Sequence, residues 1–170
     1  MSLNIVKGMD TVSRNVKKYI AIETATGGLL EDVETVINSV NSDIPVDPPC
    51  VWIVEHPTIP YDNNNLSNTQ RVVTTFEFVC VEHDDDLEIA QIKGENLATR
   101  VGACILKNLN NVRDDEDDPI RVFDKVVFKA LYPVGEVSVV GKQEKIPATS
   151  IIFEFIHTFD WLKCKKIKGE

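Results

Sequence analysis

Two segments of nearly the same pattern constrain this chain more than any other feature. Residues 74–81 read TTFEFVCV and residues 150–157 read SIIFEFIH. Because successive side chains of a strand point to opposite faces, the aromatic residues of each segment share one face, while Glu77 and Glu154 lie on the other. We expect both segments to form pleated edges of one sheet, with these side chains facing its core: Phe76, Phe78, Cys80, Ile151, Phe153, Phe155 and Phe159.

Length and composition favour a single domain. A chain of 170 residues can bury about two-thirds of its unfolded surface. No run approaches the ~20 apolar residues of a membrane span, and residues 1–10 lack the apolar core of a secretory signal, so we expect a protein that is intracellular when made. The four cysteines, Cys50, Cys80, Cys104 and Cys164, form no Cys-x-x-Cys pair, and we expect buried reduced thiols and no metal or other cofactor.

The charge pattern disfavours a protein that grips nucleic acid. The formal net charge is -9, whereas binding phosphates over a broad surface requires clustered Lys and Arg. Acidic residues concentrate in 82–88 and 114–118, and basic residues concentrate in 163–168. Such a chain can present opposite charges to different neighbours.

The first half of the chain predicts helices followed by a buried strand. Apolar residues recur every three or four positions in 10–24 and again in 29–40, with Gly27-Gly28 between them, so two helices are expected. Residues 50–54 follow a Pro-Pro pair and form a short apolar strand. The asparagine-rich loop 61–68 is expected to be a projecting arm.

The second half predicts strands around one long helix. A strand over 71–81 precedes a helix over 87–110, which carries an apolar stripe and a separate ridge of small residues. One ridge is expected to pack on the sheet and the other to remain for a neighbouring subunit. The small ridge consists of Ala90, Gly94, Ala98 and Gly102. The remaining elements are expected strands over 122–131, 134–140 and 148–161, interrupted at Pro133 and Gly135, with a polar hairpin tip at 141–145.

Catalytic signatures are missing from the sequence. The histidines are His56, His83 and His157, and His157 is in phase with the apolar face of its strand, which predicts a core or interface histidine with one satisfied nitrogen. His83 beside Asp84–Asp86 lacks the alternating spacing of a calcium loop. Asp124 and Asp160 leave open an acidic metal pair. We therefore expect no catalytic, cofactor-binding or metal-binding residues.

The order of elements resembles that of tail-terminator or tail-completion proteins of tailed bacteriophages, which belong with the neck and minor tail proteins. The resemblance covers residues 29–161: a helix at 29–40, the segment 47–53 (DPPCVWI), the strand 73–81, the helix 87–110 and the late strands. It implies an α+β fold in a single domain, with a mixed, mostly antiparallel sheet packed by a long helix, N-terminal helices and projecting arms. The parts are an N-terminal helical extension (1–28), the terminator-like domain (29–161) and a basic tail (162–170).

The resemblance also implies a function. Such a protein forms a homo-oligomeric ring, usually a hexamer, that caps the tail tube at the head–tail interface, stops tube growth and lets DNA pass without specific binding. Its location is the virion tail or neck, after synthesis in the host cytoplasm, and its partners are the tail tube and neck, head-completion or sheath proteins, with no membrane. The candidates for facing the channel are Asp84, Asp85, Asp86, Asp114, Asp115, Glu116, Asp117 and Asp118. The candidates for interfaces are Asn63, Asn64, Asn65, Lys142, Gln143, Glu144, Lys145, Ala98 and Gly102.

Three alternatives remain open at this point. The chain can be another phage neck or head-completion protein, a cytoplasmic metal-dependent hydrolase that uses the acidic runs, or an adaptor that binds a partner by adding a strand at an exposed sheet edge. Assembly state separates these alternatives, because only the virion protein is expected to form a closed ring.

Overall fold

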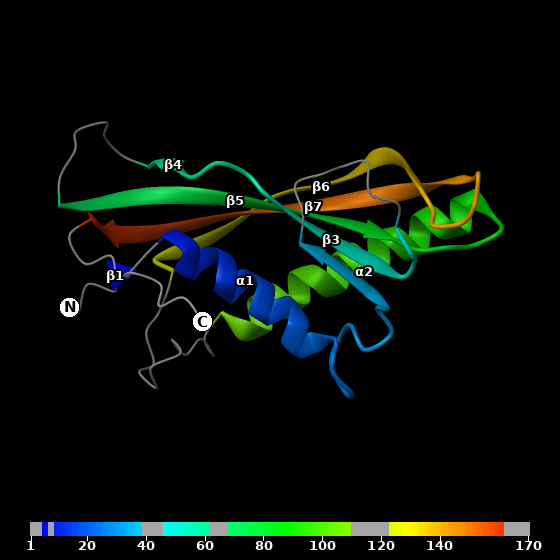
Figure 1. The fold of residues 1–170 in the computed structure, drawn as a ribbon, viewed down its shortest axis with the longest axis horizontal. Coiled ribbons are helices and arrows are strands. Elements are labelled where there is room, and N and C mark those ends of the chain that lie inside the picture. Colours follow the sequence, from blue (N-terminus) through cyan, green and yellow to red (C-terminus); the bar gives the residue numbers. More distant parts are fainter. Residues whose placement is uncertain (1–4, 7–8, 39–45, 62–67, 110–122, 162–170) are drawn as a thin grey trace.

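A computed structural model describes residues 5–6, 9–38, 46–61, 68–109 and 123–161. The fold is α+β: one mixed, mostly antiparallel sheet carries two helices on one of its faces (Figure 1). This confirms the expected fold class. Neither helix has the length and apolar content needed to cross a membrane.

The sheet has seven strands among the described residues. They are β1 (Ile5–Val6), β2 (Thr35–Asn38), β3 (Cys50–Glu55), β4 (Ile59–Pro60), β5 (Thr69–Val81), β6 (Lys125–Ser138) and β7 (Lys145–Asp160). The main order is β1-β7-β5-β3-β2, with β4 beside β5 and β6 beside β7. The β2–β3 and β1–β7 pairs are parallel, and the others are antiparallel.

The two similar segments are neighbours at the centre of the sheet. β5 and β7 pair along the whole length of β5, and Phe76 lies opposite Phe153. The expectation that they form edges is wrong, because β3 and β4 cover the other side of β5, and β6 and β1 cover the other side of β7. The facing of their side chains is confirmed, since Phe76, Phe78 and Phe155 are fully buried in one core. The Phe76 and Phe155 rings meet edge to face with centroids 5.4 Å apart, and the Phe76 and Phe78 rings are stacked.

Both helices pack on the aromatic face of the sheet. α1 spans Met9–Glu23 and α2 spans Leu87–Asn108. α2 begins where the Asp86 carboxylate accepts hydrogen bonds from the Glu88 and Ile89 backbone N–H groups, as an N-cap does. Val12, Val16 and Ile20 of α1 belong to the same core cluster as the α2 and sheet residues. The N-terminal helix is therefore an integral layer of the domain core.

The prediction of a second helix over residues 29–40 is wrong. The chain instead turns through 24–32 and enters β2 at Thr35, where the Glu34 and Thr35 N–H groups both donate to the Pro49 carbonyl. Thr35, Val36 and Ile37 are β-branched, which lowers helix propensity and suits a strand. Leu30 and Val33 are still buried, as the pattern predicted. Residues 39–40 lie outside the described part.

β6 and β7 form a long hairpin. β6 is a single strand in place of the two expected. Its register shifts between Pro133 and Gly135, which confirms the predicted irregularity there, and also between Phe128 and Ala130, where no break was predicted. Next to the hairpin turn, Val139 and Ile146 belong to a second, smaller core cluster with Trp52 on the other sheet face. In Figure 1 the hairpin turn lies beside the N-terminal end of α2, at one end of the long axis.

Candidate interaction surface

An apolar groove lies between α2 and the β6 side of the sheet. Its volume is about 420 Å³. The side chains that line it are Thr99, Gly102, Ile105, Leu106 and Leu109 from α2, Val126, Phe128 and Leu131 from β6, and Ile151 and Phe153 from β7. Leu106 is 71% exposed and Phe128 is 57% exposed, so large apolar side chains at the groove are open to water. Contiguous exposed apolar surface of this kind is typical of a protein contact site.

The groove exists because the helix layer is narrower than the sheet. α2 lies over β7 and β5, and the added Cβ of an alanine at Gly102 would lie 3.1 Å from Ile151 Cδ1 and 3.5 Å from Phe153 Cζ. Glycine at this position lets the helix backbone approach the centre of the sheet. Among the described residues, no helix lies over the outer part of the β6 face that carries Val126 and Phe128.

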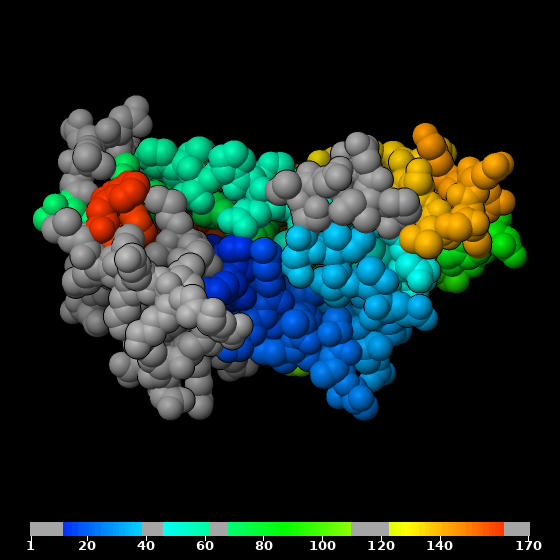
Figure 2. All heavy atoms as spheres, in the orientation of Figure 1, coloured from blue at the N-terminus to red at the C-terminus, as the bar shows by residue number. Residues whose placement is uncertain are grey.

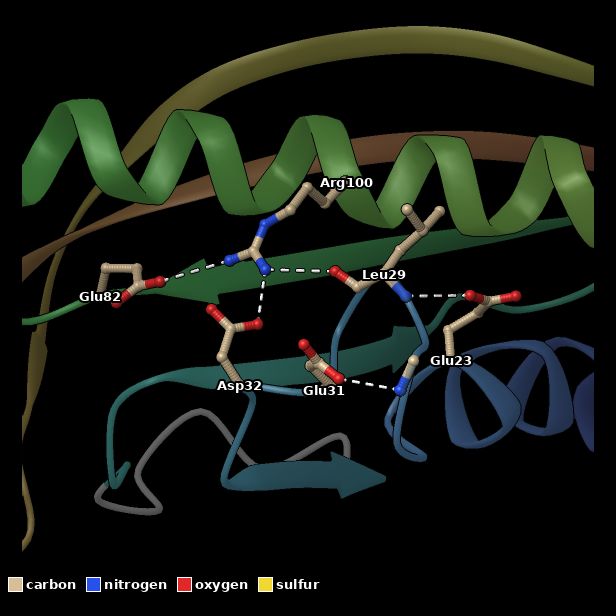
Figure 3. A network of polar contacts seen from close by, with 7 residues as sticks. Glu23, Leu29, Glu31, Asp32, Glu82 and Arg100 are labelled. Carbon is tan, nitrogen blue, oxygen red and sulfur yellow. Dashed lines mark hydrogen bonds and ion pairs between the residues drawn. The ribbon is translucent and has the colours of Figure 1, made fainter.

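The opposite flank of α2 is occupied by the turn that follows α1. Figure 3 shows Arg100 reaching from α2 to this turn, where its guanidinium donates to the Leu29 carbonyl at 3.1 Å and to Asp32 at 2.5 Å. The second terminal nitrogen lies 3.5 Å from Glu82 at the end of β5. The hydrogen bond from Arg100 lowers the pKa of Asp32, whereas burial raises the pKa of Glu82. Arg100 thus ties helix, turn and strand together.

A buried carboxylate fixes α1 to α2. Glu23, at the end of α1, is 2% exposed and accepts hydrogen bonds from Asn108 Nδ2 at 2.9 Å and Lys107 Nζ at 3.0 Å. It also accepts from the Leu29 N–H at 3.0 Å (Figure 3). These donors, led by Asn108, lower the pKa of Glu23 to about 2 despite its burial.

The small-residue ridge of α2 packs against the sheet of its own chain. Ala90, Gly94 and Ala98 are buried, and a Cβ at Gly94 would lie 3.3 Å from Thr149 Oγ1 on β7. The larger residues Leu97 and Val101 are buried as well. The expectation that one ridge stays free for a neighbour is therefore wrong, and Ala98, at 0% exposure, has no surface for another subunit. Of the two interface candidates on α2, only Gly102 borders an open surface, the groove.

Of the two polar arms predicted to contact other subunits, the structure describes the hairpin tip 141–145 but not the asparagines of the loop 61–68. Lys142, Gln143, Glu144 and Lys145 are exposed at the β6–β7 turn, and the Lys142 ammonium lies 3.0 Å from His83 Nε2 in the loop before α2. This tip therefore contacts the body of its own chain. Asn63, Asn64 and Asn65 lie outside the described residues.

The acidic run Asp84–Asp86 has local structural partners. Asp84 accepts the Asp86 N–H at 3.1 Å and pairs with Lys93 at 2.7 Å, and this hydrogen bond from Lys93 lowers the pKa of Asp84. Asp86 caps α2, and Asp85 is exposed. The other channel candidates, Asp114, Asp115, Glu116, Asp117 and Asp118, lie outside the described residues.

His157 is a core residue, as predicted. It is fully buried, its Nε2 lies 3.3 Å from Thr74 Oγ1, and its Nδ1 has no hydrogen-bond partner among the residues that the structure describes. Burial lowers the pKa of His157 to about 4, so the ring is neutral near pH 7. Cys50, Cys80 and Cys104 are free and buried, and burial raises the pKa of each thiol. Cys164 lies outside the described residues.

The sheet face opposite the two helices carries a polar cluster around Glu77 that the sequence pattern did not reveal. Glu77 Oε1 accepts from Ser150 Oγ at 2.6 Å and from the Tyr132 hydroxyl at 3.3 Å, while Oε2 lies 3.2 Å from His56 Nε2. The members come from four strands or strand ends, so only the sheet register unites them. The serine hydroxyl is bonded to the carboxylate and the histidine contacts the same carboxylate, which differs from the serine–histidine contact of an activated nucleophile.

The two aspartates considered for a metal pair have other surroundings. Asp124 accepts from the Thr158 hydroxyl at 2.9 Å and lies 3.9 Å from Arg71, whereas Asp160 is buried at the end of β7. Among the described residues, no three His, Cys, Asp or Glu side chains are grouped so that they could hold a metal ion.

Comparison with known proteins finds no family model that matches this chain, and no curated protein matches it.

Proposed function

We propose that this protein is a structural component of a tailed-bacteriophage virion, a tail-terminator or completion protein. In this role, copies of the chain form a ring at the end of the tail tube, stop its growth, join tail to head and let DNA pass. The observation that carries the proposal is the apolar groove between α2 and β6, where Leu106 and Phe128 are exposed beside a complete aromatic core. Apolar surfaces of this kind are enriched in contacts between subunits.

The order of elements also supports the proposal. The long helix, the strand 73–81 and the late strands on which the resemblance rests correspond to α2, β5, β6 and β7. One part of the resemblance, the helix over 29–40, is replaced by a turn and β2. The acidic net charge suits a channel wall, because like charges repel the phosphate backbone of passing DNA.

A role without catalytic turnover is part of the proposal. The polar side chains described above have structural tasks: Glu23 joins α1 to α2, Arg100 holds the turn, and Asp86 caps a helix. Strand addition by an adaptor partner is less well supported, because β6 carries Lys125, Lys129, Pro133 and two register shifts, features that protect a sheet edge from pairing.

The proposal is tested by the assembly state of the purified protein. Light scattering after size exclusion and electron microscopy should show closed rings, and addition of Mg²⁺, Zn²⁺ or a chelator should leave them unchanged. Phage particles made without the protein should carry tails of uncontrolled length or tails that are not joined to heads. A protein that remains monomeric at all concentrations, or that binds Mg²⁺ tightly at one ion per chain, contradicts the proposal.

A further inference from the structure

The helix layer has two flanks with complementary surfaces. One flank of α2 is closed by α1 and the turn 24–34 through Glu23 and Arg100. The other flank opens into the groove that is lined by Gly102 and Leu106. At 3.6 residues per turn, the groove-lining positions of α2 point about opposite to Arg100. In the described part of the chain, the layer therefore ends with α1 on one side and with an uncovered apolar strip on the other.

The outer face of α1 has the chemistry to fill that strip. Arg14, Lys18 and Ile22 recur every four residues and are all exposed, and Ile22 is 50% exposed. In Figure 2, α1 and the following turn, drawn in blue, form part of the surface that faces the viewer. This face combines one apolar side chain at the C-terminal end with basic side chains towards the N-terminus.

The lip of the groove has the matching pattern along α2. Leu106 is the exposed apolar residue near the C-terminal end, and the exposed Glu95 and Glu88 follow on the same flank towards the N-terminus. Arg14 lies about 12 Å from Ile22 along its helix axis, and Glu95 lies about 16 Å from Leu106 along α2. If the α1 of a second copy lay parallel to α2, Ile22 would meet Leu106 and Phe128, and Arg14 would lie near Glu95.

We propose that α1 of a second copy of this chain packs into the α2–β6 groove as the next helix of the layer. The contact is heterologous, since it joins two different surfaces, and repeating it closes a ring when the rotation between copies allows closure. The inference rests on the proposed function in requiring self-assembly, and it names the surfaces that make the contact. The apolar part excludes water, and the charge pattern sets the direction of the helix.

Substitutions at exposed positions test the contact without disturbing the core. Leu106→Glu should convert the assembly to folded monomers, as seen by light scattering with an unchanged circular dichroism spectrum. Leu87→Glu is the matched control, because Leu87 is also exposed on α2, at 57%, and does not line the groove. Arg14→Glu and Glu95→Lys should each weaken assembly at low salt, and the two together should restore it.

Cross-linking tests the pairing directly. In a Cys164→Ser background, a chain with both Ile22→Cys and Leu106→Cys should form covalent oligomers up to ring size with a short bismaleimide, and either cysteine alone should not. Covalent dimers of Leu106→Cys alone would indicate a two-fold contact and overturn the proposal. Wild-type rings that survive Leu106→Glu contradict only this contact, whereas a wild-type chain that never assembles contradicts the proposed function as well.

Discussion

At the scale of single residues, the buried His157 makes the free energy of unfolding depend on pH. Its pKa is about 4 in the folded chain because burial disfavours the charged ring, compared with 6.5 for an ordinary histidine. Between these two values the unfolded state binds more protons, so the free energy of unfolding falls as the pH falls from 6.5 towards 4. The loss attributable to this residue should reach about 3 kcal/mol at the lower end.

Urea unfolding at several pH values measures this effect. His157→Gln should flatten the dependence between pH 6.5 and 4, because the substitution removes the buried imidazole. The nearby charge of Asp124 favours the protonated ring, so Asp124→Asn should lower the pKa of His157 further. Equal slopes for the wild type and His157→Gln would show that His157 does not account for the acid sensitivity.

Ala98 tests how closely α2 approaches the sheet. It is fully buried on the small-residue ridge, so Ala98→Leu should cost about 1–3 kcal/mol of unfolding free energy through overpacking. Ala103→Leu adds the same volume to an exposed position of the same helix and should change stability by less than about 0.5 kcal/mol. Chemical denaturation compares the two, and equal stabilities would contradict the packing described here.

At the scale of elements, Arg100 holds the turn 24–34 against α2. Arg100→Met keeps the aliphatic part of the side chain but removes the bonds to Leu29 and Asp32 and the ion pair with Glu82. We expect a loss of about 1.5–3 kcal/mol, the usual range for hydrogen bonds to charged groups. Hydrogen exchange of the Leu30 amide, which donates to the Glu23 carbonyl, should accelerate.

Lys93→Met is the control for this element. Its ion pair with Asp84 is nearer to solvent, with the lysine side chain 48% exposed, so its loss should destabilise the protein less than the loss of Arg100 does. It should leave exchange in the turn unchanged. If Arg100→Met leaves the Leu30 amide equally protected, the turn is held by its apolar contacts and not by the guanidinium.

The elements that the sequence predicted well are those with a strong local signal. α1, α2, β3, β5 and β7 begin and end within a few residues of their expected bounds, because an apolar period or a cap marks each one. β2 was missed because its apolar residues also satisfy a helical spacing. Pairing with β3 and the two hydrogen bonds that the Pro49 carbonyl accepts from Glu34 and Thr35 favour the strand, and both come from a segment that the local pattern does not include.

The candidate surface was less predictable than the fold. Val126 and Phe128 alternate as core residues do, and no local pattern shows that the helix layer stops short of them. The same holds for Glu77, whose partners His56, Tyr132 and Ser150 come from separate segments. Both features depend on which strands become neighbours, and this is information that sequence periodicity does not carry.

At the scale of the whole molecule, a ring of these chains would place many acidic side chains around its channel. The run 114–118 supplies five carboxyl groups per chain, and six copies would therefore contribute about thirty negative charges. Screening over about 8 Å at physiological salt leaves such a field in place within a narrow lumen. We expect one acidic run, 84–86 or 114–118, to face this lumen and to keep DNA off its wall.

Replacing the acidic residues of 114–118 by Asn and Ser should therefore spare folding and ring formation but slow DNA release from assembled particles. The rate of ejection, followed with a DNA-binding dye, measures this effect. The run 84–86 needs a narrower change, because Asp86 caps α2 and Asp84 pairs with Lys93, so Asp85→Asn is the variant that leaves the helix start intact. If a structure of the assembled ring places both runs on its outer surface, the lumen prediction fails, while the α1 contact in the α2–β6 groove is decided separately by the Leu106 variants.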